Sequence, residues 1–265
     1  MRVAITGSAG RMGRTLVEAV LSSTDLKLCA ALEVADSPQL GKDAGEALGT
    51  TSGILVSADY AGAIAAADCL IDFTRPAGSL LHLDACLNSG TRMVIGTTGF
   101  AAEGKQRIAD AAKQIPIVFA PNMAVGVNAT FRLAEVAAKI FGDAYDVEIV
   151  EAHHRNKIDA PSGTALKLGE VVAQALGRDL KHCAVYGREG DTGERAAAAI
   201  GFHAIRGGDI VGEHTVIFAG SGERVEITVR SQSRMTYAVG ALRAARFLGG
   251  KTPGLYDMQD VLGLR

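Results

Sequence analysis

The feature that most restricts the fold is a glycine turn near the start of the chain. The run Arg2 to Thr6 leads directly into Gly7-Ser8-Ala9-Gly10-Arg11-Met12-Gly13, and an amphipathic stretch follows to about Ser22. In a strand, turn and helix of this kind, the glycines permit a tight turn, a close approach of a pyrophosphate and close packing of helix on strand. The free N–H groups and positive dipole end of the helix face the anion. We therefore predict a dinucleotide site with contacts from Gly7, Ser8, Ala9, Gly10, Arg11 and Met12.

Short β-rich runs alternate with helical runs through the first half of the chain. The strand-like runs lie at 26–32, 68–73, 91–95 and 115–120, and helical patterns at 78–88 and 103–113 separate the later ones. Strands separated by helices of this length imply parallel crossovers. The pattern predicts an α/β, Rossmann-type, doubly wound parallel sheet.

The pattern changes after residue 122. Helical runs at 128–141 and 164–176 are mixed with strand-like runs at 146–152, 198–205, 214–219 and 224–230, the last two joined by a glycine hairpin. This predicts an α+β domain with a mostly antiparallel sheet. Because 265 residues exceed what one core usually organises, we expect a dinucleotide-binding domain at 1–124 and 234–265. A substrate-binding and oligomerisation domain is expected at 125–233.

Glu33 stands twenty residues beyond Gly13, at the end of the second predicted strand. A carboxylate there accepts hydrogen bonds from the adenosine ribose hydroxyls, and the alternative is a solvated carboxylate at a strand end. The next residue, Val34, offers no charge to a 2′-phosphate, and a missing charged hydrogen bond costs ~1.5–3 kcal/mol. The sequence therefore favours NADH over NADPH. NADPH is the alternative, because Arg11 and Arg75 could reach its 2′-phosphate.

Two further segments follow strands of the predicted sheet, Gly96-Thr97-Thr98-Gly99 and Ala120-Pro121-Asn122-Met123. Ligands of open α/β sheets bind at the carboxyl ends of strands. Each segment alone is equally typical of an ordinary turn. With the glycine turn, they predict cofactor contacts from Gly96, Thr97, Thr98, Ala120, Pro121, Asn122 and Met123.

The segment richest in reactive side chains runs from Glu151-Ala-His153-His154-Arg-Asn-Lys157 to Asp159-Ala-Pro-Ser-Gly163-Thr164. Basic side chains and a histidine pair before a helix N-terminus form a receptor for anionic groups. The N–H groups of Gly163 and Thr164 are expected to bind a carboxylate. A metal site is the weaker alternative, because the histidine pair has no third ligand nearby, so we expect no metal. The other alternative is a solvated basic loop.

Composition excludes several classes of protein. With 27 basic and 29 acidic residues the net charge is −2, so no global field recruits nucleic acid or an anionic membrane. No apolar run reaches the length needed to span a bilayer. The four cysteines show no metal-ligand spacing. We expect a cytoplasmic protein without nucleic-acid or membrane partners.

At these motifs the sequence resembles the 4-hydroxy-tetrahydrodipicolinate reductase family, also called dihydrodipicolinate reductase. The resemblance spans essentially the whole chain. Besides the segment 151–164 and the glycine turn, it is carried by Asp72-Phe-Thr-Arg-Pro76, Gly96-Thr-Thr-Gly99 and Gly207-Gly-Asp-Ile-Val-Gly-Glu-His214. Two residues depart from the family's usual pattern: Val34 replaces a basic residue, and Asn156 replaces a histidine.

The resemblance implies a homotetramer in which NAD(P)H reduces a small cyclic dicarboxylate, 4-hydroxy-tetrahydrodipicolinate, to tetrahydrodipicolinate in diaminopimelate and lysine biosynthesis. It implies that His153 donates or accepts a proton and that Lys157 donates one. It assigns substrate contacts to His154, Gly163 and Thr164. The alternatives are a dehydrogenase of the same plan acting on an amino-acid semialdehyde or keto acid, and a non-catalytic NAD-binding sensor.

Overall fold

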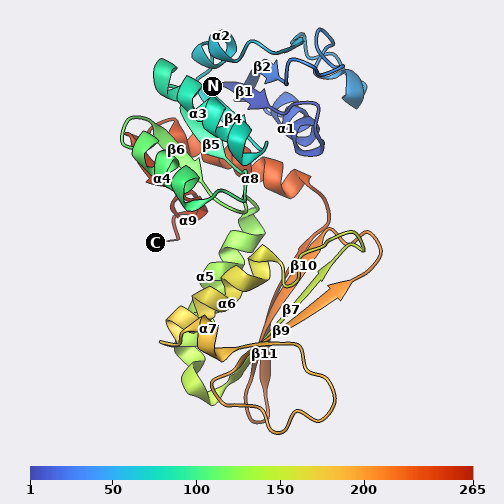
Figure 1. Cartoon of the computed structure of the whole chain (residues 1–265), viewed down its shortest axis with the longest axis vertical. Coiled ribbons are helices and arrows are strands. Elements are labelled where there is room, and N and C mark those ends of the chain that lie inside the picture. The colour runs from blue at the N-terminus through green and yellow to red at the C-terminus, as the bar shows by residue number, and fades with distance from the viewer. Residues whose placement is uncertain (265) are drawn as a thin grey trace. The chain divides into compact units, whose positions relative to one another are not determined.

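A computed structural model describes residues 1–264 of the chain (Figure 1). These residues fall into two compact units. The first unit is Met1–Val125 with Arg234–Arg265, and the second is Gly126–Ser233.

The first unit is built on a seven-stranded sheet in which every pairing is parallel. Its strand order is β12-β6-β5-β4-β1-β2-β3, the doubly wound order whose direction of winding reverses between β1 and β4. The strands are β1 (Arg2–Thr6), β2 (Lys27–Leu32), β3 (Val56–Ser57), β4 (Cys69–Asp72), β5 (Arg92–Ile95), β6 (Pro116–Phe119) and β12 (Gly254–Tyr256).

Helices cover both faces of this sheet. One face is covered by α1 (Arg11–Leu21) and α8 (Met235–Leu248), the other by α2 (Tyr60–Ala65), α3 (Pro76–Ser89) and α4 (Ala102–Ala111). Side chains along β1 alternate between the faces: Val3 and Ile5 join the core under α1 and α8, and Ala4 joins the other core. The short elements η1 (Glu46–Leu48) and α9 (Met258–Leu262) complete the unit.

The second unit contains a mixed five-stranded sheet in the order β11-β10-β7-β9-β8. Its pairs β10–β11 and β10–β7 are antiparallel, whereas β7–β9 and β8–β9 are parallel. Helices α5 and α6 accompany this sheet in Figure 1. The elements are α5 (Val125–Phe141), η2 (Gly142–Ala144), β7 (Asp146–His153), α6 (Gly163–Ala175), α7 (Leu180–Cys183), β8 (Ala184–Tyr186), β9 (Ile200–Arg206), β10 (Gly212–Ala219) and β11 (Arg224–Ser231).

The predicted fold class is confirmed, with a Rossmann-type parallel sheet in one unit and a second sheet with antiparallel strands in the other. The sequence patterns missed the shortest elements, among them β3, α2, β8 and β12. Strands of two or three residues are too short to show a period, and pairing with a neighbour is what makes them strands. Among residues 1–264, no helix is both long and apolar enough to cross a bilayer.

Candidate active site

The glycine turn connects β1 to α1 and is closed by its own backbone. Gly7 has a φ of 62°, and its carbonyl accepts a hydrogen bond from the N–H of Gly10 at 3.0 Å. A Cβ on Gly13 would lie 2.0 Å from that same carbonyl oxygen. Gly10 provides no side-chain cap for α1, so N–H groups of the first helical turn remain available to an anion.

Glu33 reaches the glycine turn from the end of β2. Its Oε1 accepts a hydrogen bond from the N–H of Ala9 at 2.9 Å. The hydroxyl of the neighbouring Ser8 is buried and has no hydrogen-bond partner among the described residues. A buried hydroxyl without a partner is costly. The open helix end and this hydroxyl suit an anionic ligand, so the residues present fit a dinucleotide.

A buried carboxylate, Asp72, links three loops at the same edge of the sheet. It accepts hydrogen bonds from the hydroxyls of Thr6 at 2.9 Å, Ser79 at 2.6 Å and Thr97 at 2.8 Å, and it also bonds the Nδ1 of His82. Burial alone would raise its pKa, but the bonds from His82 and Ser79 lower that pKa to about 2. An ionised carboxylate therefore fixes the ends of β1, β4 and β5.

The two other predicted cofactor segments lie at this carboxyl edge. Gly96 follows β5, and a Cβ there would lie 2.2 Å from the ring of Phe73, so only glycine fits beside the β4 loop. Ala120 to Met123 follow β6, where the side chain of Asn122 accepts a hydrogen bond from the N–H of Ala124 at 2.9 Å. All the predicted cofactor residues therefore follow the ends of β1, β2, β5 and β6 on one sheet.

In the second unit, β7 carries His153 at its last residue. The Nδ1 of His153 lies 2.6 Å from Oε2 of the buried Glu151. Arg206 lies at the end of the adjacent β9, and its two terminal nitrogens donate hydrogen bonds to that carboxylate at 2.8 and 2.7 Å. A Cβ on Gly212 would lie 3.1 Å from Nε2 of His153, so the glycine leaves space at this nitrogen. The pair with Glu151 therefore occupies Nδ1 and leaves Nε2 as the other hydrogen-bonding nitrogen of the ring.

The start of α6 is attached to the same carboxylate. The N–H of Ser162 bonds Oε1 of Glu151 at 3.0 Å, and its hydroxyl caps the helix by accepting from the N–H of Ala165 at 3.2 Å. That hydroxyl also lies 2.8 Å from Nε2 of His214 on β10. Gly163, the first residue of α6, is exposed. The positive end of α6 is thus held beside His153.

The loop between β7 and α6 carries the other predicted residues. The Lys157 ammonium bonds both carboxylate oxygens of Asp159, at 2.7 and 2.9 Å. The Nδ1 of His154 is buried without a partner among the described residues. The backbone of Arg206 to Gly208 supports the loop, because the N–H of Gly207 donates to the His153 carbonyl at 3.0 Å.

Burial determines the charge of the histidines. It lowers the pKa of His153 below 6.5, although the hydrogen bond to the Glu151 carboxylate opposes the shift. Burial also lowers the pKa of His214 to about 4, and the nearby charge of His153 adds to this shift. Both rings are therefore neutral at pH 7, and the cations near His153 are Lys157 and Arg206.

Of the predicted substrate-site residues, His153 ends β7, His154 and Lys157 lie in the loop that follows, and Gly163 and Thr164 begin α6. The sequence reasoning gave no role to Glu151, Arg206, His214, Gly212, Asp72 or His82. Glu151, Asp72, Gly212 and His214 stand within motifs noted for the resemblance, which was the available signal. Arg206 and His82 stand outside them. The part of the chain that the structure describes shows no cluster of three or more His, Cys, Asp or Glu placed for a metal.

A Rossmann-type nucleotide-binding unit, joined in one chain to a unit with a buried Glu–His pair and a cationic loop, defines an oxidoreductase. Two family models match the chain: "Dihydrodipicolinate reductase, N-terminus" over residues 1–123 and "Dihydrodipicolinate reductase, C-terminus" over residues 126–262. The chain belongs to the dihydrodipicolinate reductase family.

Relatives named 4-hydroxy-tetrahydrodipicolinate reductase match the chain throughout. Those of Nitrosomonas eutropha and Dechloromonas aromatica are both 63% identical, over 100% of this chain and 99% and 98% of their own lengths. Among solved structures, a dipicolinate-bound dihydrodipicolinate reductase from Paenisporosarcina is 27% identical with a TM-score of 0.79, covering 98% of both chains. An amine dehydrogenase from Mycobacterium smegmatis, 14% identical with a TM-score of 0.59, shares only the fold.

Proposed function

We propose that the chain reduces 4-hydroxy-tetrahydrodipicolinate to tetrahydrodipicolinate with NAD(P)H and loss of water, in diaminopimelate and lysine biosynthesis. Family membership over the whole chain supports this reaction. The observation that carries it is the arrangement in which Glu151 holds His153 beside Lys157 and the N-terminus of α6. We assign the first unit to the dinucleotide and the second to substrate binding and tetramer formation, in a cytoplasmic enzyme.

The substrate is a dianion, and the second unit offers matching groups. One carboxylate is assigned to the start of α6, where Gly163 and Thr164 stand at the positive end of the helix dipole. The buried Nδ1 of His154 has no partner among the described residues, and we assign it a hydrogen bond with the substrate. The Lys157 ammonium can leave its ion pair with Asp159 and bind a carboxylate of the substrate instead.

Proton delivery falls to His153 and Lys157. A nicotinamide held by the first unit would supply a hydride, and the reduced substrate ring would then need a proton. The ammonium group of Lys157 is the proton donor that the loop supplies. His153 is neutral at pH 7 because burial lowers its pKa, and its Nδ1 is committed to Glu151. We therefore assign proton exchange to its Nε2. This nitrogen would give a proton to the leaving water, or exchange one with the substrate nitrogen.

The cofactor residues proposed are Gly7 to Met12, Glu33, Gly96 to Thr98 and Ala120 to Met123. Of the two cofactors, NADH is favoured for two reasons. The hydrogen bond from the N–H of Ala9 holds the Glu33 carboxylate beside the glycine turn, and Val34 presents no charge to a 2′-phosphate. The N–H groups of α1 hold the pyrophosphate.

A coupled assay with freshly made substrate and each cofactor in turn tests the proposal. We expect turnover with the cyclic dicarboxylate and none with aspartate semialdehyde, the substrate class of the alternative dehydrogenase. His153→Ala and Lys157→Ala should each lower kcat by roughly 10²–10⁴ while NADH binding, followed by fluorescence titration, persists. Full turnover in both variants, or activity confined to the aldehyde, would contradict the proposal.

A further inference from the structure

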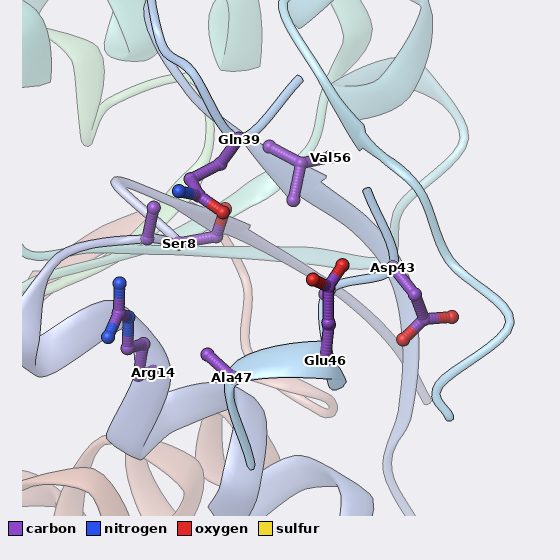
Figure 2. A pocket seen from close by; sticks show the side chains of 9 residues that line it. Ser8, Arg14, Gln39, Asp43, Glu46, Ala47 and Val56 are labelled. Carbon is purple, nitrogen blue, oxygen red and sulfur yellow. The ribbon is translucent and has the colours of Figure 1, made fainter. Parts of the chain in front are cut away.

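Each of the two residues assigned to proton delivery is paired with a carboxylate of its own. His153 is bonded to Glu151 at 2.6 Å, and the Lys157 ammonium is bonded to Asp159 at 2.7 and 2.9 Å. Both pairs belong to the second unit. The cavity in Figure 2 lies in the first unit, against the glycine turn, and belongs to the proposed dinucleotide site instead. A fifth residue of the second unit joins the two pairs.

This fifth residue is Arg206, the last residue of β9. Its two terminal nitrogens donate hydrogen bonds to both carboxylate oxygens of Glu151, at 2.8 and 2.7 Å. The nitrogen Nη2 also donates to the backbone carbonyl of Asp159 at 2.7 Å. One guanidinium therefore contacts the partner of His153 and the partner of Lys157 at the same time.

The sheet fixes the position of Arg206. β9 pairs in parallel with β7, and Arg206 lies opposite His153 in that pairing. The N–H of Gly207 donates to the His153 carbonyl at 3.0 Å, which holds the two strand ends together. The Nη1 of Arg206 also donates to the carbonyl of Ile205 at 2.7 Å. The guanidinium is thus attached to the same strand ends that carry His153.

The ion pair of Lys157 with Asp159 does not by itself fix the loop between β7 and α6. The side chain of Asp159 is 56% exposed, and an ion pair that solvent reaches contributes little. The bond from Arg206 to the Asp159 carbonyl differs, because its donor is charged and the arginine side chain is only 20% exposed. The position of Lys157 therefore depends on Arg206 more than on the Asp159 carboxylate.

We propose that Arg206 is a positioning residue for proton delivery, which fixes Lys157 relative to His153 by holding Glu151 and the backbone of Asp159 together. Arg206 acts through the residues that it holds and does not itself exchange a proton. The inference rests on the proposed function for the roles of His153 and Lys157. It adds to that function the connection that makes the two residues act as one unit.

Arg206→Lys tests the geometry, because it keeps the positive charge and loses the planar set of donors. It should lower kcat by ~10-fold to 100-fold, the worth of a charged hydrogen bond, and leave the KM for NADH unchanged. Asp159→Asn keeps the carbonyl that Arg206 bonds, so it should lower kcat less than Arg206→Lys does. A loss of NADH affinity equal to the loss of kcat in Arg206→Lys would overturn the positioning role in favour of general support of the fold.

Arg178→Lys is the matched control for this substitution. The Arg178 guanidinium, in the same unit, also bonds one carboxylate and one backbone carbonyl, those of Asp143 and Ala198. None of these three residues belongs to the proposed site. The control should leave kcat unchanged, and equal losses in the two lysine variants would contradict a specific role for Arg206.

The pH profile of kcat separates the charge of Arg206 from its geometry. Besides Arg206, the charged or titratable groups near His153 are Glu151 on β7, Lys157 in the loop and His214 on β10. The positive charge of Arg206 lowers the pKa of His153. Arg206→Gln should therefore move the acidic limb to higher pH, whereas Arg206→Lys should leave it in place. A shift of the same size in both variants would contradict the separation.

A binding cycle tests the connection to Lys157 without turnover. The full-length protein is titrated calorimetrically with pyridine-2,6-dicarboxylate in four forms: wild type, Arg206→Lys, Lys157→Ala and the double variant. Lys157→Ala should weaken binding in the wild type by ~10-fold or more, and much less when Arg206→Lys is already present. Additive effects of the two substitutions would overturn the inference, because uncoupled residues add. A wild type that binds this dicarboxylate but fails to reduce the substrate would refute the proposed reaction alone, and the cycle would still decide on Arg206.

Discussion

The carboxylate of Glu151 lies 2.6 Å from Nδ1 of His153, and both side chains are buried. A carboxylate at this nitrogen holds the proton on Nδ1 and leaves Nε2 free, so one residue sets the tautomer of the other. Arg206 and the N–H of Ser162 hold the carboxylate in turn. We therefore regard Glu151 as a positioning residue for the proton transfer.

Glu151→Gln should lower kcat by roughly 10²-fold with little change in the KM for NADH. The amide cannot stabilise the Nδ1 proton as a carboxylate does, and it leaves Arg206 without its ion pair. Steady-state kinetics and a pH profile of kcat give the readout. Glu213→Gln, which removes an exposed ion pair between Glu213 on β10 and Arg230 on β11, is the control. Equal losses in kcat and in NADH affinity would indicate general damage to the fold instead.

Acid should destabilise the protein through His214. Its pKa is lowered to about 4 by burial and by His153, against about 6.5 in the unfolded chain. Above about pH 6.5 the ring is neutral in both states. As the pH falls toward 4, the unfolded chain binds the proton and the folded protein does not, so stability is lost by up to about 3 kcal/mol.

Urea unfolding at pH 7 and at pH 4.5 tests this contribution of His214. His214→Gln keeps a hydrogen-bonding amide for the Ser162 hydroxyl and removes the titrating group. The variant should therefore lose less unfolding free energy than the wild type between the two pH values. Identical losses in both proteins would assign the acid sensitivity to other groups.

The carboxylate of Asp72 should stabilise the first unit. Asp72→Asn removes the ionised acceptor of Thr6, Ser79, Thr97 and His82, and breaking a buried pair costs about 3–5 kcal/mol. Chemical denaturation should show a loss of this order together with weaker NADH binding. Asp84→Asn is the matched control, because its carboxylate forms an exposed bridge with Arg107 that contributes little. Equal stabilities of the two variants would argue against the network.

Local sequence patterns predicted the elements that are long and periodic. The strand Arg2 to Thr6, the glycine turn and α1 follow one another as expected, because apolar spacing and glycine conformation are properties of neighbouring residues. The parallel pairing of β7 with β9 was not predicted. Periodicity shows that a segment is a strand, and tertiary packing selects its partner and direction.

The supporting side chains of the site were not predicted for a related reason. Arg206 donates hydrogen bonds to Glu151, which is 55 residues away in the sequence. His214 is hydrogen-bonded with Ser162, which is 52 residues away. Thr97 bonds Asp72 across 25 residues. No local spacing connects such pairs, because the adjacency of strands in the folded sheet creates them. Motifs within one loop, such as His153 with Lys157, could be read from the sequence.

Glu33 allows one more test of the cofactor site. Its Oε1 bonds the N–H of Ala9 at 2.9 Å, which holds the carboxylate where ribose hydroxyls are expected. Glu33→Ala should weaken NADH by ~10-fold, the worth of a hydrogen bond to a charged group. It should weaken NADPH less, because the carboxylate repels a 2′-phosphate. Fluorescence titration with both cofactors gives the two affinities, and Asp36→Ala, an exposed acid three residues later, is the control. A parallel loss of both affinities would remove Glu33 from the ribose and leave it only a role in holding the glycine turn.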